Sequence, residues 1–384
     1  MKKKILIVTL SDLRYDARVR RQVQALKDSY QITLSGFNGV FSEDYVLVPL
    51  MPTRLTLLRK LITAVLLMMR AYRLAHRVLH DYLPFLRNQL SGQSFDLIIA
   101  NDVETLPLAF ALPGHHRVLF DAHEYAPRHF EDKLMWRLFF QPFNVWLCRK
   151  YLPLTKAMTT VGAGLAKEYK KNFNVDPVVI PNATNYFDLK PVPVEDNKIR
   201  LVYMGIVNPS RRLELMMEMM DLLDDRFVLD LFLLTPGFAS DKTKKYIDSL
   251  QQYSERNPRI RLFPPIKSVD VVKTINHYDI GVFLLPPINF NYENTLPNKL
   301  FDYIQARLGI AIGPTPEMAQ IVNAYHNGVV SQDFTPQSLA EKLNPLTKAQ
   351  IQNFKLNSEK AAIEFNAEKS AVILQELAHK AINA

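Results

Sequence analysis

Cysteine is nearly absent from this chain of 384 residues, which contains only Cys148. A single thiol forms neither a disulfide framework nor a cysteine-rich zinc site. Its neighbours Trp146, Leu147 and Arg149 favour a buried, unreactive side chain over a nucleophile. Disulfide-stapled scaffolds and zinc-finger proteins are therefore excluded as classes.

Long hydrophobic runs are also missing. A membrane-spanning helix needs roughly 18 or more consecutive apolar residues, and the sequence has no such run. The N-terminus, three lysines followed by the apolar residues 5–8, superficially resembles a signal peptide. Asp12 and Arg14 end its apolar stretch too early, so we interpret it as a first buried strand. We accordingly predict a cytoplasmic protein.

No glycine-rich phosphate loop follows this first strand, so a dinucleotide-binding fingerprint is excluded. Strand 5–10 leads into loop 11–16, and the apolar spacing predicts a helix over 16–26. In open α/β sheets, ligands bind beyond the carboxyl ends of the strands, which is where this loop lies. Asp16 fits either a ligand-facing position or a helix cap.

Apolar residues make up 48% of the chain, enough for two cores, and the length favours two domains. The formal charge is +9, from 47 Lys and Arg against 38 Asp and Glu. This balance suits nucleotides, anionic lipid headgroups or nucleic acid, and composition alone does not choose among them.

Two series of strands and helices divide the chain. Further strands are predicted over 30–37, 95–100 and 118–120, and a second series begins at 199–205, with later strands at 227–234, 260–263, 280–285, 309–313 and 328–330. The proline-containing and charged segment 186–198 reads as the linker between two α/β units.

The most informative stretch is 293–307, which follows the apolar strand 280–285. It reads as a loop, a proline at the first helical position (Pro297) and an amphipathic helix. First-turn N–H groups favour an anion, and a cation such as Lys299 is unfavourable there unless an anion sits beside it. Asp302 lies one turn further on the same face. This arrangement fits a nucleotide diphosphate; an ordinary surface helix is the alternative.

The residues Pro297 to Tyr303, Pro-Asn-Lys-Leu-Phe-Asp-Tyr, closely resemble the Pro-Asn-Lys-Leu-Phe-Glu-Tyr signature of bacterial GT-B glycosyltransferases, family 4 and its relatives. The resemblance implies an α/β protein of GT-B fold, two Rossmann-like domains with a cleft between them. It places the acceptor domain at 1–184, the nucleotide-sugar domain at 185–366, and a terminal helix, 367–384, back on the first domain. It further implies retaining, metal-independent sugar transfer without a cofactor.

The same resemblance assigns site residues. Catalytic roles go to His123, Arg211 and Lys299; donor binding to Gly205, Pro265, Ile266, Glu293, Asn294, Asn298 and Asp302; and acceptor-side positions to Asp16, Arg18 and Asp102. His123 lies in Asp-Ala-His-Glu after strand 118–120, a strand end that suits a ligand contact, although a structural histidine is the alternative. The other histidines, including His129, have no such context. No Asp-x-Asp motif with a plausible metal role occurs.

The match departs from the family pattern at two places. The family often carries Glu-x7-Glu, whose first glutamate is Asn294 here, with Glu293 beside it. The glycine that usually follows the diphosphate-binding arginine is Arg212. Asn294 is the main support for a second hypothesis, a non-catalytic GT-B subunit that binds a nucleotide or scaffolds a partner. A nucleic-acid-binding protein is suggested only by charge, and we expect no nucleic-acid partner.

Two basic, apolar segments suggest an anionic membrane surface as a further partner. Segment 54–77 brackets an apolar patch with basic residues in a helical stretch expected over 54–90. Segment 133–151 interleaves aromatic and basic side chains. Core packing is the alternative for both. We expect a UDP-sugar rather than a GDP-sugar donor, a glycan or lipid-linked acceptor, and a place on the inner face of the plasma membrane.

Overall fold

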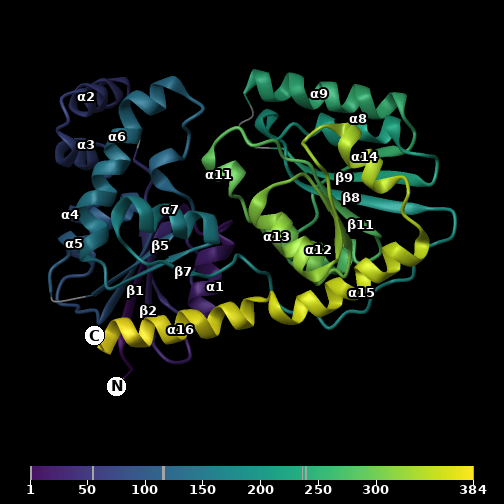
Figure 1. Cartoon of the computed structure of the whole chain (residues 1–384). Coiled ribbons are helices and arrows are strands. Elements are labelled where there is room, and N and C mark those ends of the chain that lie inside the picture. The colour runs from purple at the N-terminus through teal and green to yellow at the C-terminus, as the bar shows by residue number, and fades with distance from the viewer. Residues whose placement is uncertain (1, 54–55, 115–116, 236, 238–239, 384) are drawn as a thin grey trace. The chain divides into compact units, whose positions relative to one another are not determined.

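The computed structural model describes every residue except 1, 54–55, 115–116, 236, 238–239 and 384. The chain forms two compact units (Figure 1). Unit 1 comprises 1–181, 289–291 and 370–384, and unit 2 comprises 182–288 and 292–369. The sequence-based boundaries, after residues 184 and 366, lie close to these divisions, whereas the assignment of 289–291 to unit 1 has no counterpart in them.

Unit 1 is built on a parallel sheet in the order β3-β2-β1-β4-β5-β6-β7. From β1, the chain first adds strands on one side of the sheet (β2 and β3) and then, from β4 on, on the other side. Open α/β sheets bind ligands at this point of reversal, between β1 and β4. Both faces of the sheet are covered, so β4 and most of β1 and β5 are buried. The strands are β1 (Lys4–Asp12), β2 (Gln31–Phe37), β3 (Val46–Leu50), β4 (Leu97–Asn101), β5 (Arg117–Ala122), β6 (Ala157–Thr160) and β7 (Val178–Val179).

Helices cover the two faces of this sheet. Ile5 and Ile7 of β1 pack with α1 and α16, while Leu6 and Val8 face the core formed with α3 to α7. Gln375 Nε2 of α16 donates to Ala25 O at 2.6 Å, and this ties the C-terminal helix to α1 (Figure 1). The helices are α1 (Ala17–Leu26), α2 (Leu57–Met68), α3 (Tyr72–Leu79), α4 (Leu83–Gln89), α5 (Leu106–Ala111), α6 (Leu134–Tyr151), α7 (Ala163–Phe173) and α16 (Ala367–Asn383).

The helical stretch expected over 54–90 is wrong as one element, because the chain breaks it into α2, α3 and α4; residues 54 and 55 lie outside the described part. At the first break, Arg70 adopts a left-handed conformation, φ 57°. Ala71 N then donates to Leu66 O at 2.8 Å and Arg70 N to Leu67 O at 3.1 Å. These bonds satisfy the carbonyls at the end of α2 in the manner of a Schellman motif, without the usual glycine.

Unit 2 repeats the architecture with a parallel sheet in the order β10-β9-β8-β11-β12-β13. Its order also reverses once, between β8 and β11. This is the strand order 3-2-1-4-5-6 of a complete Rossmann-type sheet. The strands are β8 (Ile199–Ile206), β9 (Phe227–Leu234), β10 (Ile260–Phe263), β11 (Ile280–Phe283), β12 (Gly309–Ile312) and β13 (Gly328–Val330).

The helices of unit 2 pack in pairs, α8 with α14 and α12 with α15. The interior of α15 carries Lys355, whose Nζ donates to Tyr278 O at 2.6 Å and lies 3.3 Å from Asp279 Oδ1. This buried pair fastens α15 to the end of the loop before β11. The helices are α8 (Glu214–Leu222), α9 (Asp241–Arg256), α10 (Val271–Ile275), α11 (Phe290–Glu293), α12 (Asn298–Gln305), α13 (Pro316–Tyr325), α14 (Pro336–Leu343) and α15 (Lys348–Glu364).

Candidate functional site

The signature segment forms α12, which is anchored to the centre of the unit 2 sheet. Tyr303 Oη donates to the carbonyls of Val202 in β8 and Val282 in β11, at 3.3 and 3.1 Å. Its ring fills the space above Gly281, where an added Cβ would come within 2.3 Å of it. Pro297 is the residue before the helix, not its first helical residue as expected, and no side chain caps the helix start. The uncapped first turn therefore keeps free N–H donors.

Lys299, in this first turn, is a buried cation held against aromatic rings. Lys299 is only 8% exposed. Its Nζ lies 4.3 Å from the ring centre of Phe283 and 5.0 Å from that of Tyr203. The part of the chain that the structure describes contains no ion pair between Lys299 and a carboxylate. Burial, and then the charge of Arg211, lower the pKa of Lys299 well below its usual value, and Asp302 opposes the shift. A buried cation without a paired anion costs stability.

Arg211 reaches the same place from the other side of the strand-order reversal. It ends the short 3-10 helix η4 (Pro209–Arg211), which follows β8. Its guanidinium lies near the Tyr203 hydroxyl: burial raises the pKa of Tyr203, and the nearby Arg211 opposes this rise. A Cβ added at Gly205 would lie 2.8 Å from Tyr203 Oη and 3.4 Å from Arg211 Nη1. Gly205 therefore leaves room for the Tyr203 hydroxyl. Two cations thus converge beside Tyr203, an arrangement that suits a multiply charged anion.

Arg212 shows why a glycine is usual after this arginine. Its φ of 50° lies in the left-handed region, which glycine adopts without strain. The chain keeps this turn with an arginine, at a cost of about 1 kcal/mol, and the Arg212 side chain pairs with Glu214 at 2.5 Å. The substitution therefore leaves the local loop geometry in place.

The other residues predicted to bind the donor differ in exposure and in their place along the chain. Asn298 is exposed at the start of α12, and Asp302 is half-buried one turn after Lys299. Glu293 is exposed at the end of α11, and Asn294 is half-buried immediately after it. Pro265 and Ile266 follow β10, which β9 separates from β8.

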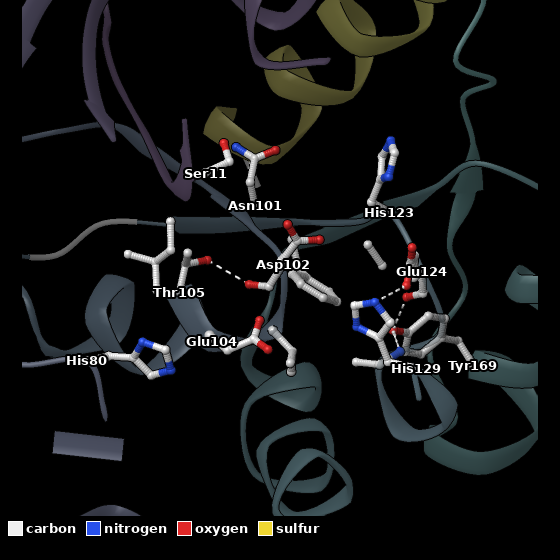
Figure 2. Close-up of a pocket in the computed structure, with 15 residues that line it drawn as sticks. Ser11, His80, Asn101, Asp102, Glu104, Thr105, His123, Glu124, His129 and Tyr169 are labelled. Atoms are coloured by element: carbon white, nitrogen blue, oxygen red, sulfur yellow. Dashed lines mark hydrogen bonds and ion pairs between the residues drawn. The ribbon is translucent and has the colours of Figure 1, made fainter. Parts of the chain in front are cut away.

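Unit 1 has a pocket of about 360 Å³ at its own strand-order reversal, beyond the ends of β1, β4 and β5 (Figure 2). It is a small cavity for a ligand site, since such pockets typically span about 300–1,000 Å³. Its lining residues are Leu10, Ser11, His80, Asn101, Asp102, Val103, Glu104, Thr105, Phe120, Ala122, His123, Glu124, Ala126, His129 and Tyr169.

The three acceptor-side residues form one ion-pair cluster at this pocket. Arg18 Nη1 and Nη2 donate to the two Asp102 oxygens at 3.3 and 3.0 Å, and Nη2 lies 3.6 Å from Asp16 Oδ2. Burial alone would raise the pKa of Asp102, but Arg18 lowers it. Asp16 is also the cap of α1, accepting from Val19 N at 3.1 Å. The Asp16 side chain therefore caps α1 and also belongs to the ion-pair cluster beside the pocket.

Asp102 occupies a strained backbone conformation, φ 66° and ψ 153°, that is essentially restricted to glycine. It persists because Asp102 N donates to Asp121 O at 3.1 Å and Thr105 Oγ1 donates to Asp102 O at 2.8 Å. The strain turns the Asp102 side chain into the pocket (Figure 2). Such local strain is typical of ligand-binding positions.

His123 lines the pocket, as do two ionisable residues that the sequence left without a role. Burial, and then Arg18, lower the pKa of His123, so its imidazole is neutral. His129 Nε2 pairs with Glu124 Oε2 at 2.5 Å (Figure 2). Burial alone would lower the pKa of His129, but this pairing raises it. His129 has no strand-end context in the sequence, but it follows the turn η2 (Ala126–Arg128) and lines the pocket.

Glu104 is a carboxyl of the pocket whose pKa is strongly raised. Burial, and then the charge of Asp102, raise its pKa from the usual 4.5 to about 7. The sequence placed Glu104 at a strand end but gave no sign that it is half-buried in this pocket. Ser11, whose hydroxyl donates to Asp16 Oδ2 at 2.5 Å, was likewise not foreseen. A group of three or more metal-ligating side chains occurs nowhere in the described residues.

The basic, apolar segments form a surface on unit 1, made by α2, the start of α3 and the first half of α6; α2 packs against both of the others. Only Thr63 and Leu67 of α2 are buried, whereas Leu57 and Met69 at its two ends are 74% and 71% exposed. The other exposed apolar residues of this surface are Leu58, Leu61, Ile62, Val65, Met68, Leu74, Leu134, Met135 and Leu138.

The aromatic residues of α6 behave differently from the expectation for a membrane interface. Phe143 is buried, and Phe139, Phe140 and Trp146 pack against the unit 1 core. Core packing is therefore the correct interpretation of that stripe, and aliphatic side chains make the exposed face. None of the described helices has the length and apolarity to cross a bilayer.

Comparison with known proteins identifies the fold. No protein-family model matches the chain, and no curated protein matches it by sequence. Among solved structures, sucrose-phosphate synthase from Thermosynechococcus elongatus superimposes with a TM-score of 0.78 at 12% identity, over 99% of both chains. An E. coli trehalose-6-phosphate structure bound with UDP-2-fluoro glucose gives 0.71 at 10% identity, over 98% of this chain and 99% of that one. S. aureus TarM in complex with UDP gives 0.61 at 13% identity, over 79% and 59%. The chain has the GT-B fold, with two Rossmann-like units.

Proposed function

We propose that the chain is a retaining, metal-independent glycosyltransferase, which moves a sugar from a nucleotide-diphosphate donor to a glycan or lipid-linked acceptor in bacterial cell-surface polysaccharide biosynthesis. The observation that carries the proposal is the pair Lys299 and Arg211, two cations that converge beside Tyr203 at the strand-order reversal of unit 2. The free N–H groups of α12 point to the same anionic ligand.

The chemistry follows from where these charges lie. As the bond between the sugar and the diphosphate breaks, negative charge grows on the leaving phosphate, and Lys299, Arg211 and the helix start stabilise it. Asp302 accepts hydrogen bonds from donor hydroxyls one turn along. The acceptor hydroxyl attacks from the face that the phosphate leaves and passes its proton to that phosphate, so configuration is retained. UDP is the favoured nucleotide, in line with the UDP ligands of two similar structures.

Nucleotide-dependent stabilisation tests the donor site. We expect UDP to raise the melting temperature of the wild type more than GDP does, since a ligand at a hundredfold excess over its Kd adds about 2.7 kcal/mol. Arg211→Gln should remove most of this stabilisation. Arg256→Gln, an exposed arginine at the end of α9, is the matched control and should keep it.

The outcomes also separate the alternatives. Nucleotide binding with no release of UDP from any UDP-sugar would favour a non-catalytic GT-B subunit. Stabilisation by none of the nucleotides would contradict the donor site altogether.

We further propose that the surface on α2, α3 and α6 binds the anionic inner face of the plasma membrane and so brings the enzyme to a lipid-linked acceptor. Residues 57–79 contain five basic and no acidic side chains, and residues 133–151 contain four basic and none acidic. Exposed aliphatic residues on a helix flanked by cations are typical of binding in the plane of a lipid surface. Each cation near an anionic bilayer adds about 1 kcal/mol.

Vesicle sedimentation tests this surface. The triple variant Leu58→Ser, Leu61→Ser and Met68→Ser is expected to lower partitioning onto vesicles of phosphatidylcholine and phosphatidylglycerol at least about tenfold, because apolar burial is lost. Wild-type binding should fall when the anionic lipid is omitted.

The matched control carries serine at three exposed apolar positions of unit 2, Leu222, Leu356 and Ile363. It should bind vesicles as the wild type does. Equal loss in both triple variants, or wild-type binding that ignores lipid charge, would argue against the assigned surface.

A further inference from the structure

The unit 1 pocket has an unusual balance of charge. Three carboxyl groups line it, those of Asp102, Glu104 and Glu124, and Figure 2 shows them around one central space. No lysine or arginine is among the described residues that line it. Arg18, a cation beside the pocket, already binds Asp102.

The second cationic group at the pocket, His129, also has a carboxylate partner. His129, the histidine whose pKa is raised, pairs with Glu124. Burial, and then His76, lower the pKa of His80 to about 3, so His80 is neutral. His123 is neutral for the reasons given above. Among the described residues that line the pocket, each histidine is therefore either neutral or paired with a carboxylate, and a ligand meets no unpaired positive charge there.

Glu104 is the carboxyl in this group without a cationic partner. Its hydrogen bond within the protein is to its own backbone N–H. The negative charges of Asp102 and Glu124 raise the pKa of Glu104. The charge of His129 lowers it, but His129 is already paired with Glu124. Once ionised, the Glu104 carboxylate accepts hydrogen bonds from ligand hydroxyls and repels ligand anions.

We propose that the unit 1 pocket receives an uncharged, hydroxyl-bearing sugar of the acceptor, and that Glu104 determines this specificity by repelling acidic sugars. This inference rests on the proposed glycosyltransferase function and adds the substrate class of its acceptor side. The pocket volume of about 360 Å³ suits a single sugar unit rather than an extended chain. Serine, asparagine and carboxylate groups around it are hydrogen-bonding partners for hydroxyls.

Matched pairs of methyl hexosides and methyl hexuronides test the proposal, because each pair differs by a hydroxymethyl group against a carboxylate. Binding to the full chain is measured by saturation-transfer NMR at pH 8, with UDP present to occupy unit 2. The panel contains the glucose, galactose and mannose pairs. We expect the best neutral glycoside to bind at least about tenfold more tightly than its acidic counterpart, from like-charge repulsion at short range.

Two comparisons assign the discrimination to Glu104. Glu104→Gln should reduce the neutral-to-acidic ratio severalfold, whereas Glu43→Gln, on an exposed turn of unit 1, should not change it. In the wild type, the ratio should also fall between pH 8 and pH 6, as Glu104 binds its proton while the hexuronide stays ionised.

Tighter or equal binding of hexuronides, an unchanged ratio in Glu104→Gln, or binding by no neutral glycoside would overturn the inference. UDP stabilisation of the wild type is measured on the same sample. If that stabilisation persists while the sugar preference fails, the pocket assignment is wrong and the glycosyltransferase proposal stands.

Discussion

Lys299→Met is expected to lower release of UDP from UDP-sugars at least about 100-fold, while raising the free energy of unfolding of the ligand-free protein. The loss follows because Lys299 stabilises charge on the leaving diphosphate. The gain follows because the lysine is buried against Phe283 and Tyr203, where burial lowers its pKa well below the usual value. Methionine fills nearly the same volume without a charge to desolvate, and we expect a gain of about 1–3 kcal/mol.

Opposite changes in activity and stability distinguish a functional lysine from a structural one. Denaturant unfolding measures the stability, with and without UDP, and UDP should stabilise Lys299→Met far less than the wild type. Lys273→Met, at an exposed position of α10, is the control and should alter neither property. A Lys299→Met protein that is less stable and fully active would show that the lysine serves the fold.

Glu104→Gln is expected to stabilise the protein at pH 8 by about 3 kcal/mol and to have little effect near pH 4.5. The folded-state pKa of Glu104 is raised from 4.5 to about 7, by burial and then by Asp102. The folded protein therefore holds this proton more tightly than the unfolded chain does. Stability from the protonated form is complete below pH 4.5 and is lost as the pH rises to about 7. A difference of about 2.5 in pKa, at about 1.4 kcal/mol per unit, gives the expected size.

Urea unfolding at several pH values checks this dependence. The stability difference between Glu104→Gln and wild type should grow between pH 5 and pH 7 and then level off. Glu43→Gln, which replaces an exposed glutamate, should give a flat difference across the range. A flat difference for Glu104→Gln would mean that its carboxyl is hydrated like an ordinary surface group.

The local sequence pattern was sufficient to predict a strand where the strand's own residues are mostly apolar. The strands 227–234 and 260–263 have the bounds expected from their apolar residues, and β12 and β13 lie where predicted. Most residues of these strands are apolar, although β9 carries Asp230 and β10 carries Arg261, and their bounds follow from that local composition. Local pattern failed at Arg70, where a left-handed residue that is not glycine ends a helix without a sequence signal.

By itself, the sequence determined two α/β units and the importance of the segment around Lys299, because periodicity, length and a contiguous motif are properties of neighbouring residues. Only the tertiary structure decided that Arg211 and Lys299 both lie beside Tyr203, that His129 returns to pair with Glu124, and that Glu104 is half-buried near Asp102. Those facts depend on which strand ends lie side by side in a parallel sheet. Strand order joins residues far apart in the chain, and the charge of a buried group depends on its neighbours in space.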